Sequence, residues 1–275
     1  MRFTAIFVFY PAASFSDYGL TGVDTAFLYS TLGKFAIQHL SEPLPITPED
    51  PHQPYRKERT VELFTDSVII EPKGRHTATV VLLHGLTQNS KSMIDKPWVS
   101  ALGQGVKFVS VGSPPSWFNP ATWNPSTFFY NFVNGEEVVD LKSLDLSARR
   151  VSALIDSEAK LVGYQNIFLV GYSQGGMLAL WTGLMVAKQI GGLVAINTAV
   201  PVFRIGKVAN PKLDIAHFHG TSDQVVFFPI ALLSRKNAVD CGAENYRMYT
   251  NPGDHFFTDE VALKVSDWLS RKISY

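Results

Sequence analysis

The chain places one serine between glycines in the segment Ile167-Phe168-Leu169-Val170-Gly171-Tyr172-Ser173-Gln174-Gly175-Gly176. Four apolar residues that favour β-structure end at Gly171, and an apolar run compatible with a helix follows from Met177 to Met185. A β-carbon at Gly171 or Gly175 would collide with a neighbouring strand or helix, which explains glycine at both positions. The pattern predicts a strained turn between strand and helix that exposes Ser173 above a sheet.

The pattern Gly-x-Ser-x-Gly is weak on its own. With glycine and serine each near ~7% of residues, it arises by accident in roughly one chain in ten of this length. Its setting is more informative, because a strand precedes it, a long helix follows, and an acid and a histidine come later in the chain. This setting is typical of the nucleophile elbow of a serine hydrolase.

Composition excludes several other classes of protein. The 275 residues are 46% hydrophobic and 17% charged, which suits a well-cored globular domain and excludes disorder for most of the chain. Lysine plus arginine and aspartate plus glutamate number 24 each, so no charge excess indicates a nucleic-acid partner or an anionic membrane. Cys241 is the single cysteine, and no glycosylation sequon free of proline occurs; both favour the cytoplasm.

Residues 1–57 differ from the rest and are predicted to form an N-terminal extension with a proline-rich connector. Arg2 precedes an apolar run from Phe3 to Ala13, as in a signal peptide, so residues 1–15 leave a secretory or membrane-associated location as the alternative. A helix is expected over 24–40, and five prolines between Pro43 and Pro54 then favour extended chain. Residues 58–275 are expected to be the catalytic domain.

From Thr60 onward, predicted strands alternate with predicted helices. Such alternation predicts an α/β fold with a mostly parallel central sheet and helices on both faces. Strands are expected at 61–64, 67–71, 79–83, 106–111, 167–170, 193–197, 215–219 and 246–249. Helices are expected at 92–102, 144–161, 174–188, 229–238 and 258–272, and a long loop rich in proline and aromatic residues at 114–132.

Chain order selects the partners of Ser173. Of seven histidines, only His217, His219 and His255 follow the serine, and only His255 lies in a loop after the last predicted strand. Asp223 lies in a loop directly after a strand, whereas Asp254 adjoins the histidine itself and Asp240 lies in or beside a helix. We therefore expect Ser173, Asp223 and His255 to act as nucleophile, acid and base.

Attack of a serine on a carbonyl group also requires donors for the developing oxyanion. The backbone N–H of Gln174, at the start of the helix, and that of Leu86, after His84-Gly85, are expected to supply them. We expect His84 to stabilise the loop in which it lies and not to act in catalysis. His217 and His219 should lie on one face of a strand, but no third ligand accompanies them, so neither a metal nor another cofactor is expected.

At these motifs the chain resembles the acyl-protein thioesterase, carboxylesterase and lysophospholipase family of α/β-hydrolases. The resemblance runs from about residue 60 to the end and rests on Leu83-His84-Gly85-Leu86, Pro115-Ser116-Trp117-Phe118, the segment 171–176, the segment 219–226 and Gly253-Asp254-His255. It implies the same catalytic triad and oxyanion donors, and an apolar acyl channel without a large cap domain. The chain departs from the family at Thr87-Gln88 and at Asn119, which border the site.

The expected activity is cleavage of carboxylic esters or thioesters through an acyl-enzyme. The aromatic loop favours medium or long acyl chains, with Trp117, Phe118 and Val200 as substrate contacts. The substrate would be a small ester, an acylated protein or a lysolipid, and a transient membrane-surface contact would suit the last two. Alternatives are a lysophospholipase, a short-chain esterase, or a non-catalytic binding protein of the same fold, against which the intact triad argues. The sequence leaves the oligomeric state open.

Overall fold

A computed structural model of the chain describes residues 67–86, 88–112, 131–133, 136–138, 141–200 and 206–273. The expected extension at 1–57, the boundary that follows it and the strand expected at 61–64 lie outside these residues. The same holds for Trp117, Phe118, Asn119 and Thr87.

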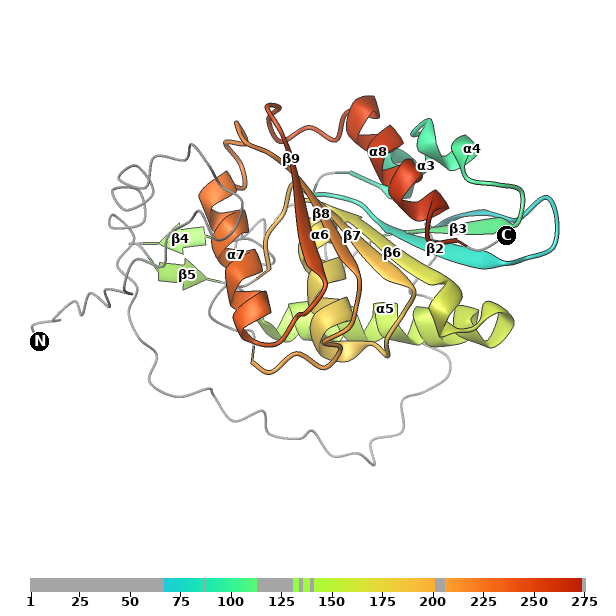
Figure 1. Cartoon of the computed structure of the whole chain (residues 1–275), viewed down its shortest axis with the longest axis horizontal. Helices are drawn as coiled ribbons and strands as arrows, with labels where there is room; N and C mark the ends of the chain where they lie inside the picture. The colour runs from blue at the N-terminus through green and yellow to red at the C-terminus, as the bar shows by residue number, and fades with distance from the viewer. Residues whose placement is uncertain are drawn as a thin grey trace, which may run out of the picture.

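A seven-stranded sheet forms the centre of the molecule, with strand order β1-β3-β2-β6-β7-β8-β9 (Figure 1). All neighbouring pairs are parallel except β1 with β3, which is antiparallel. The strands are β1 (Val68–Ile70), β2 (Ala78–Leu83), β3 (Val106–Val111), β6 (Ile167–Tyr172), β7 (Gly192–Ile196), β8 (Ile215–Gly220) and β9 (Tyr246–Asn251). The carboxyl ends of the six strands other than β1 meet at one edge of the sheet, where ligands bind in open α/β folds.

Helices cover both faces of this sheet, as the alternating pattern predicts (Figure 1). One layer contains α5 (Leu141–Val162), α6 (Gln174–Trp181) and α7 (Phe228–Asp240); the other contains α3 (Ser90–Ile94), α4 (Trp98–Ala101) and α8 (Asp259–Ser270). Strand β2 is buried on both sides because Val81 and Leu83 join the core under α5 and α6, while Val80 and Leu82 join the core under α8. The α/β-hydrolase fold is confirmed, and the described residues contain no separate cap domain.

Three local features differ from the predictions. The helix expected at 92–102 is split into α3 and α4 before Trp98, where Pro97 lacks an N–H for a continuous helix. The helix expected to reach 188 ends at Trp181 and continues as a π-helical turn, η6 (Thr182–Val186). Asn210 stabilises that turn, because its Nδ2 donates to the carbonyls of Gly183 and Ala187.

A third difference lies in the aromatic segment. The segment expected to be loop to residue 132 ends in a small antiparallel hairpin, β4 (Asn131–Val133) with β5 (Glu136–Val138). The hairpin forms a second sheet, separate from the central one. A 3₁₀ turn, η5 (Tyr164–Asn166), connects α5 to β6.

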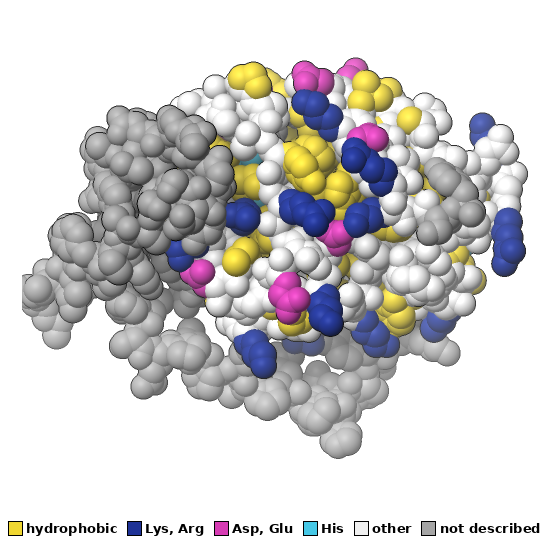
Figure 2. Space-filling model, viewed as in Figure 1, with side chains coloured by type: hydrophobic (Ala, Val, Ile, Leu, Met, Phe, Trp, Pro, Cys, Tyr) yellow, Lys and Arg dark blue, Asp and Glu magenta, His cyan; other side chains and the backbone are white. Residues whose placement is uncertain are grey.

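The apolar segment 175–200 contains most of the buried helix α6 and the central strand β7. No helix in the described residues has both the length and the apolar character needed to cross a bilayer. Figure 2 shows lysine and arginine side chains interspersed with acidic and apolar ones on the face in view.

Candidate active site

Ser173 lies at the turn between β6 and α6 in a backbone conformation that side chains rarely adopt. Its φ is 53° and its ψ is −118°, and its N–H donates to the carbonyl of Ile196 on the neighbouring strand (2.9 Å). A β-carbon on Gly171 would lie 2.2 Å from the carbonyl oxygen of Gly175, and one on Gly175 would lie 2.2 Å from that of Leu83. The predicted elbow is therefore confirmed in its geometry, including the reason for its two glycines.

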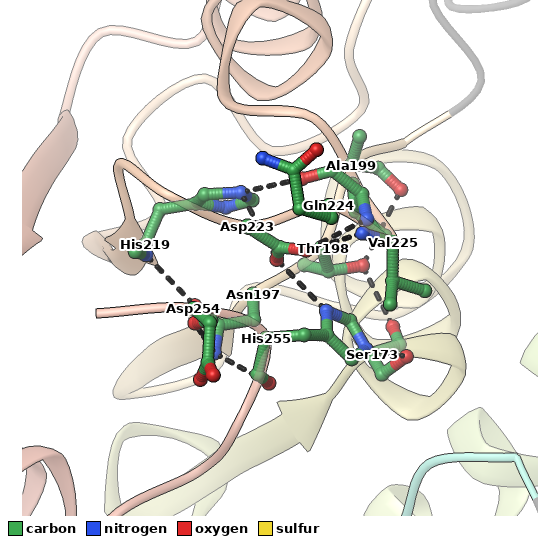
Figure 3. Close-up of polar contacts among 12 residues, drawn as sticks. Ser173, Asn197, Thr198, Ala199, His219, Asp223, Gln224, Val225, Asp254 and His255 are labelled. Carbon is green, nitrogen blue, oxygen red and sulfur yellow. Dashed lines mark hydrogen bonds and ion pairs between the residues drawn. The ribbon is translucent and has the colours of Figure 1, made fainter. Parts of the chain in front are cut away.

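His255 joins Ser173 to Asp223 in a continuous chain of hydrogen bonds (Figure 3). Its Nε2 lies 2.9 Å from Ser173 Oγ, and its Nδ1 lies 2.8 Å from Asp223 Oδ2. Because a carboxylate only accepts, Nδ1 carries the hydrogen and Nε2 is free to accept the serine proton. Ser173 is 5% exposed and Asp223 is 1% exposed, while the imidazole side chain is 16% exposed. The imidazole is thus the most solvent-accessible of the three groups.

The loop after β8 holds Asp223 in place through its own backbone. Asp223 Oδ1 accepts hydrogen bonds from the N–H groups of Val225 (2.8 Å) and Val226 (2.9 Å), which leaves Oδ2 for His255. The other candidate acids have different partners. The carboxylate of Asp254 is exposed and accepts from the N–H of Phe256, and Asp240 forms an exposed ion pair with a lysine on α7.

Asn197 connects the two loops that carry Asp223 and His255, and the sequence analysis did not identify this role. Its Oδ1 accepts from the N–H of Gly220 (3.0 Å), and its Nδ2 donates to the carbonyl of His255 (2.8 Å), with the carbonyls of the two adjacent residues at 3.3 Å. Asn197 is buried and has a left-handed backbone with φ 45°. An asparagine directly after an apolar strand was the available signal, since asparagine tolerates this conformation.

Tyr172 provides a second anchor for the histidine loop. Its hydroxyl donates to the carbonyl of His255 at 2.9 Å, and its ring lies 5.5 Å from the imidazole between centroids. Burial, followed by the charges of Asp223 and Asp254, raises the pKa of Tyr172 to about 12. The hydroxyl therefore remains a donor across the working range of pH.

The two expected oxyanion donors follow adjacent parallel strands, because Leu86 comes after β2 and Gln174 comes after β6. Gln174 is the first residue of α6, so its N–H has no acceptor within the helix. Leu86 follows Gly85, where a β-carbon would lie 3.3 Å from Cβ of Ser173. Gln88 closes this turn, because its Oε1 accepts from the N–H of Gly85 (3.1 Å) and its own N–H donates to the Gly85 carbonyl (3.2 Å).

The remaining predicted residues are placed as follows. His84 Nδ1 lies 2.9 Å from the carbonyl of Gly85, and burial lowers the pKa of its imidazole. Val200 is fully buried in the core beside α6, and its role as a substrate contact stays a prediction.

His217 and His219 lie side by side on β8, 3.2 Å apart between ring nitrogens. The described residues contain no group of three or more histidine, cysteine or acidic side chains that could hold a metal ion.

The sequence of this chain is similar to those of known proteins. The family described as Phospholipase/Carboxylesterase matches residues 64–271. The acyl-protein thioesterase 1 homolog 2 of Dictyostelium discoideum is 31% identical over 220 residues, which cover 76% of this chain and 98% of the relative. The acyl-protein thioesterase 1 of Yarrowia lipolytica is 29% identical over 180 residues, covering 62% of this chain and 79% of the relative.

Solved structures show the same fold. Acyl-protein thioesterase 2 of Zea mays aligns with a TM-score of 0.60 at 19% identity, covering 76% of this chain and 99% of that one. The carboxylesterase of Bacillus cereus aligns with a TM-score of 0.60 at 20% identity, covering 75% and 93%.

Proposed function

The chain belongs to the phospholipase/carboxylesterase family of α/β-hydrolases, and from this premise we propose that it cleaves carboxylic esters or thioesters through an acyl-enzyme on Ser173. The observation that carries the proposal is the hydrogen-bonded chain from Ser173 Oγ through His255 to Asp223, with distances of 2.9 Å and 2.8 Å. These distances fit a nucleophile, a general base and the acid that orients it.

In the first half-reaction, His255 Nε2 takes the proton of Ser173 Oγ as that oxygen bonds to the substrate carbonyl carbon. The N–H groups of Gln174 and Leu86 are the proposed donors to the oxyanion, and the amino terminus of α6 adds a favourable dipole. The imidazolium then gives its proton to the leaving oxygen or sulfur, and the bond from carbon to that atom breaks. Asp223 holds the Nδ1–H tautomer and stabilises the imidazolium.

In the second half-reaction, a water molecule replaces the leaving group. His255 takes a proton from the water, the hydroxyl oxygen bonds to the acyl carbon, and the Ser173 ester bond breaks as the serine recovers its proton. The products are a carboxylic acid and free enzyme, and the proposed steps require neither a metal nor a cofactor.

Apolar side chains next to the triad support an acyl substrate of medium or long chain. Val225 and Phe227 follow Asp223 in the chain, Phe256 follows His255, and all three are exposed, Phe256 to 71%. Each methylene buried by such groups contributes roughly 0.8 kcal/mol, about a fourfold gain in binding. Trp117 and Phe118 remain predicted contacts outside the described residues.

Thioesters should be accepted along with oxygen esters, because the oxyanion donors recognise the carbonyl and not the leaving atom. The names of the Dictyostelium and Yarrowia relatives favour an acylated protein as the substrate. A lysolipid or a short ester remains the alternative. A cytoplasmic location and the domain boundary near residue 57 also remain predictions.

The nucleophile is tested by replacing Ser173 with alanine. Turnover of a p-nitrophenyl ester should fall by a factor on the order of 10⁶, and covalent labelling by a fluorophosphonate should be lost. Ser100→Ala, which removes an exposed hydroxyl on α4, is the matched control and should be labelled normally. Labelling of the Ser173→Ala variant would end the assignment.

The substrate class is tested with p-nitrophenyl esters of increasing acyl length. We expect kcat/KM to rise from acetyl towards medium or long chains and then level off. A palmitoylated peptide and a lysophospholipid, assayed side by side, separate the protein from the lipid substrate. A clear preference for acetyl would instead indicate a short-chain esterase.

A further inference from the structure

We propose that His219 is a positioning residue for the carboxylate of Asp223, and that His217 and Tyr246 fix the tautomer in which it acts. These three groups form a buried row of hydrogen bonds from Tyr246 through His217 to His219, and the imidazole of His219 lies 3.5 Å from Asp223 Oδ2, the oxygen that also contacts His255. Figure 3 shows His219 beside Asp223. The inference rests on the proposed function and assigns residues to it beyond the triad.

His219 reaches Asp223 by two routes. Its Nε2 lies 2.9 Å from the carbonyl oxygen of Val226 and 3.5 Å from Asp223 Oδ2. The first is a hydrogen bond that fixes the loop, because the N–H of Val226 donates in turn to Asp223 Oδ1 (2.9 Å). The second brings the same N–H towards the carboxylate oxygen that receives His255. Loss of this N–H would therefore weaken the contacts that hold both carboxylate oxygens of Asp223 in position.

The hydrogen-bond partners determine the tautomers along the row. A carbonyl only accepts, so His219 carries its hydrogen on Nε2, and its Nδ1 is an acceptor. That Nδ1 lies 3.2 Å from His217 Nε2, which must then be the donor. His217 Nδ1 is left to accept from the hydroxyl of Tyr246 at 3.0 Å. The donated hydrogens thus run in one direction, from Tyr246 on β9 through His217 and His219 to the Val226 carbonyl.

The surroundings keep both imidazoles neutral. Burial, followed by the neighbouring His219, holds the pKa of His217 well below its usual value; a hydrogen bond to the backbone of Thr198 opposes this shift, and Arg235 on α7 adds to it. Burial also lowers the pKa of His219; the charge of Asp223 opposes this and that of His255 adds to it. A neutral His219 can hold the carboxylate by its N–H without placing a second cation beside the imidazolium that His255 becomes.

The test compares His219→Leu with His219→Gln in the full chain. Leucine removes the donor, so kcat/KM for a short p-nitrophenyl ester should fall about tenfold or more with little change in KM. The acid limb of the pH profile should move to higher pH, because loss of the N–H dipole at Asp223 lets His255 hold its proton more firmly. Glutamine retains an N–H donor, so His219→Gln should keep most of the kcat/KM of the unaltered protein and the original position of the acid limb.

A second variant keeps the test decisive if the leucine protein does not fold. Tyr246→Phe removes only the hydroxyl at the far end of the row and should shift the acid limb in the same direction by a smaller amount. Tyr249→Phe is the matched control, since this hydroxyl lies three residues along β9 on a half-exposed ring. Combined with His219→Leu, the Tyr246→Phe change should add no further shift.

The outcomes separate this inference from the proposed function. An unchanged acid limb in both His219→Leu and Tyr246→Phe would overturn the inference, even if activity fell in proportion to the folded fraction. Additive shifts in the double variant would also overturn it, since Tyr246 would then act by another route. Fluorophosphonate labelling of Ser173 in the unaltered chain reports on the proposed function alone.

Discussion

Replacing Asn197 with aspartate should release the loop of His255 while keeping the loop of Asp223 in place. The aspartate retains an oxygen for the N–H of Gly220 and tolerates the left-handed backbone at φ 45°. It loses the Nδ2 donor that lies 2.8 Å from the His255 carbonyl, and presents an acceptor to that oxygen and to the carbonyls of Asp254 and Phe256. Repulsion among these acceptors should push the histidine loop outward.

The size of the effect follows from these contacts. Misplacement of a catalytic group by about 1 Å can cost 10²-fold in rate, so we expect kcat/KM to fall about 10- to 100-fold in Asn197→Asp. Asn197→Ala should lose activity to a similar degree and also leave the buried N–H of Gly220 unpaired. That orphaned donor costs about 1–3 kcal/mol. The left-handed backbone adds about 1–2 kcal/mol for an alanine.

The measurements are kcat/KM on a short ester and urea unfolding of each variant. Asn245→Asp is a matched control, because it makes the same change at an exposed amide that donates to the carbonyl of Lys212. Its activity should equal that of the unaltered protein. If Asn197→Asp keeps kcat/KM within about twofold of the unaltered protein, the hydroxyl of Tyr172 alone anchors the His255 loop, and the reasoning fails.

Three further predictions concern stability. Gly175→Ala should prevent correct folding of the elbow, because the added carbon would lie 2.2 Å from a backbone oxygen of Leu83; normal activity of this variant would contradict the geometry. The free energy of unfolding should decrease as pH falls below 6.5, by up to about 1.4 kcal/mol per pH unit for His217, because the unfolded chain binds a proton that the buried imidazole excludes. His217→Gln should reduce this pH dependence in unfolding titrations. Lys107→Met removes the ammonium group that lies 2.8 Å from the buried carboxylate of Glu158, and should lower the free energy of unfolding by about 3–5 kcal/mol. The double variant Lys107→Met with Glu158→Leu should recover most of that stability in the same assay.

Local pattern in the sequence was enough to predict the fold and to select Ser173, Asp223 and His255. The apolar run before Ser173 ends at a glycine and is followed by a helix-compatible run, which predicts an elbow between strand and helix, and parallel strands bring their carboxyl ends to one edge. Chain order therefore selected Asp223 and His255 without knowledge of any distance, and the structure joins them to the serine. The prediction of one helix over 92–102 was wrong, although Pro97 lacks the N–H that a continuous helix requires.

Tertiary structure decided what holds the triad in position. The amide of Asn197 connects two loops that lie 23 and 58 residues further along the chain, and no periodicity or local motif encodes such a contact. The sequence placed His217 and His219 on one face of a strand, but the direction of their hydrogen bonds depends on Tyr246 and Val226, which belong to other segments. Strand and helix patterns arise from neighbours in sequence, whereas the supporting contacts arise only when distant loops meet at the edge of the sheet.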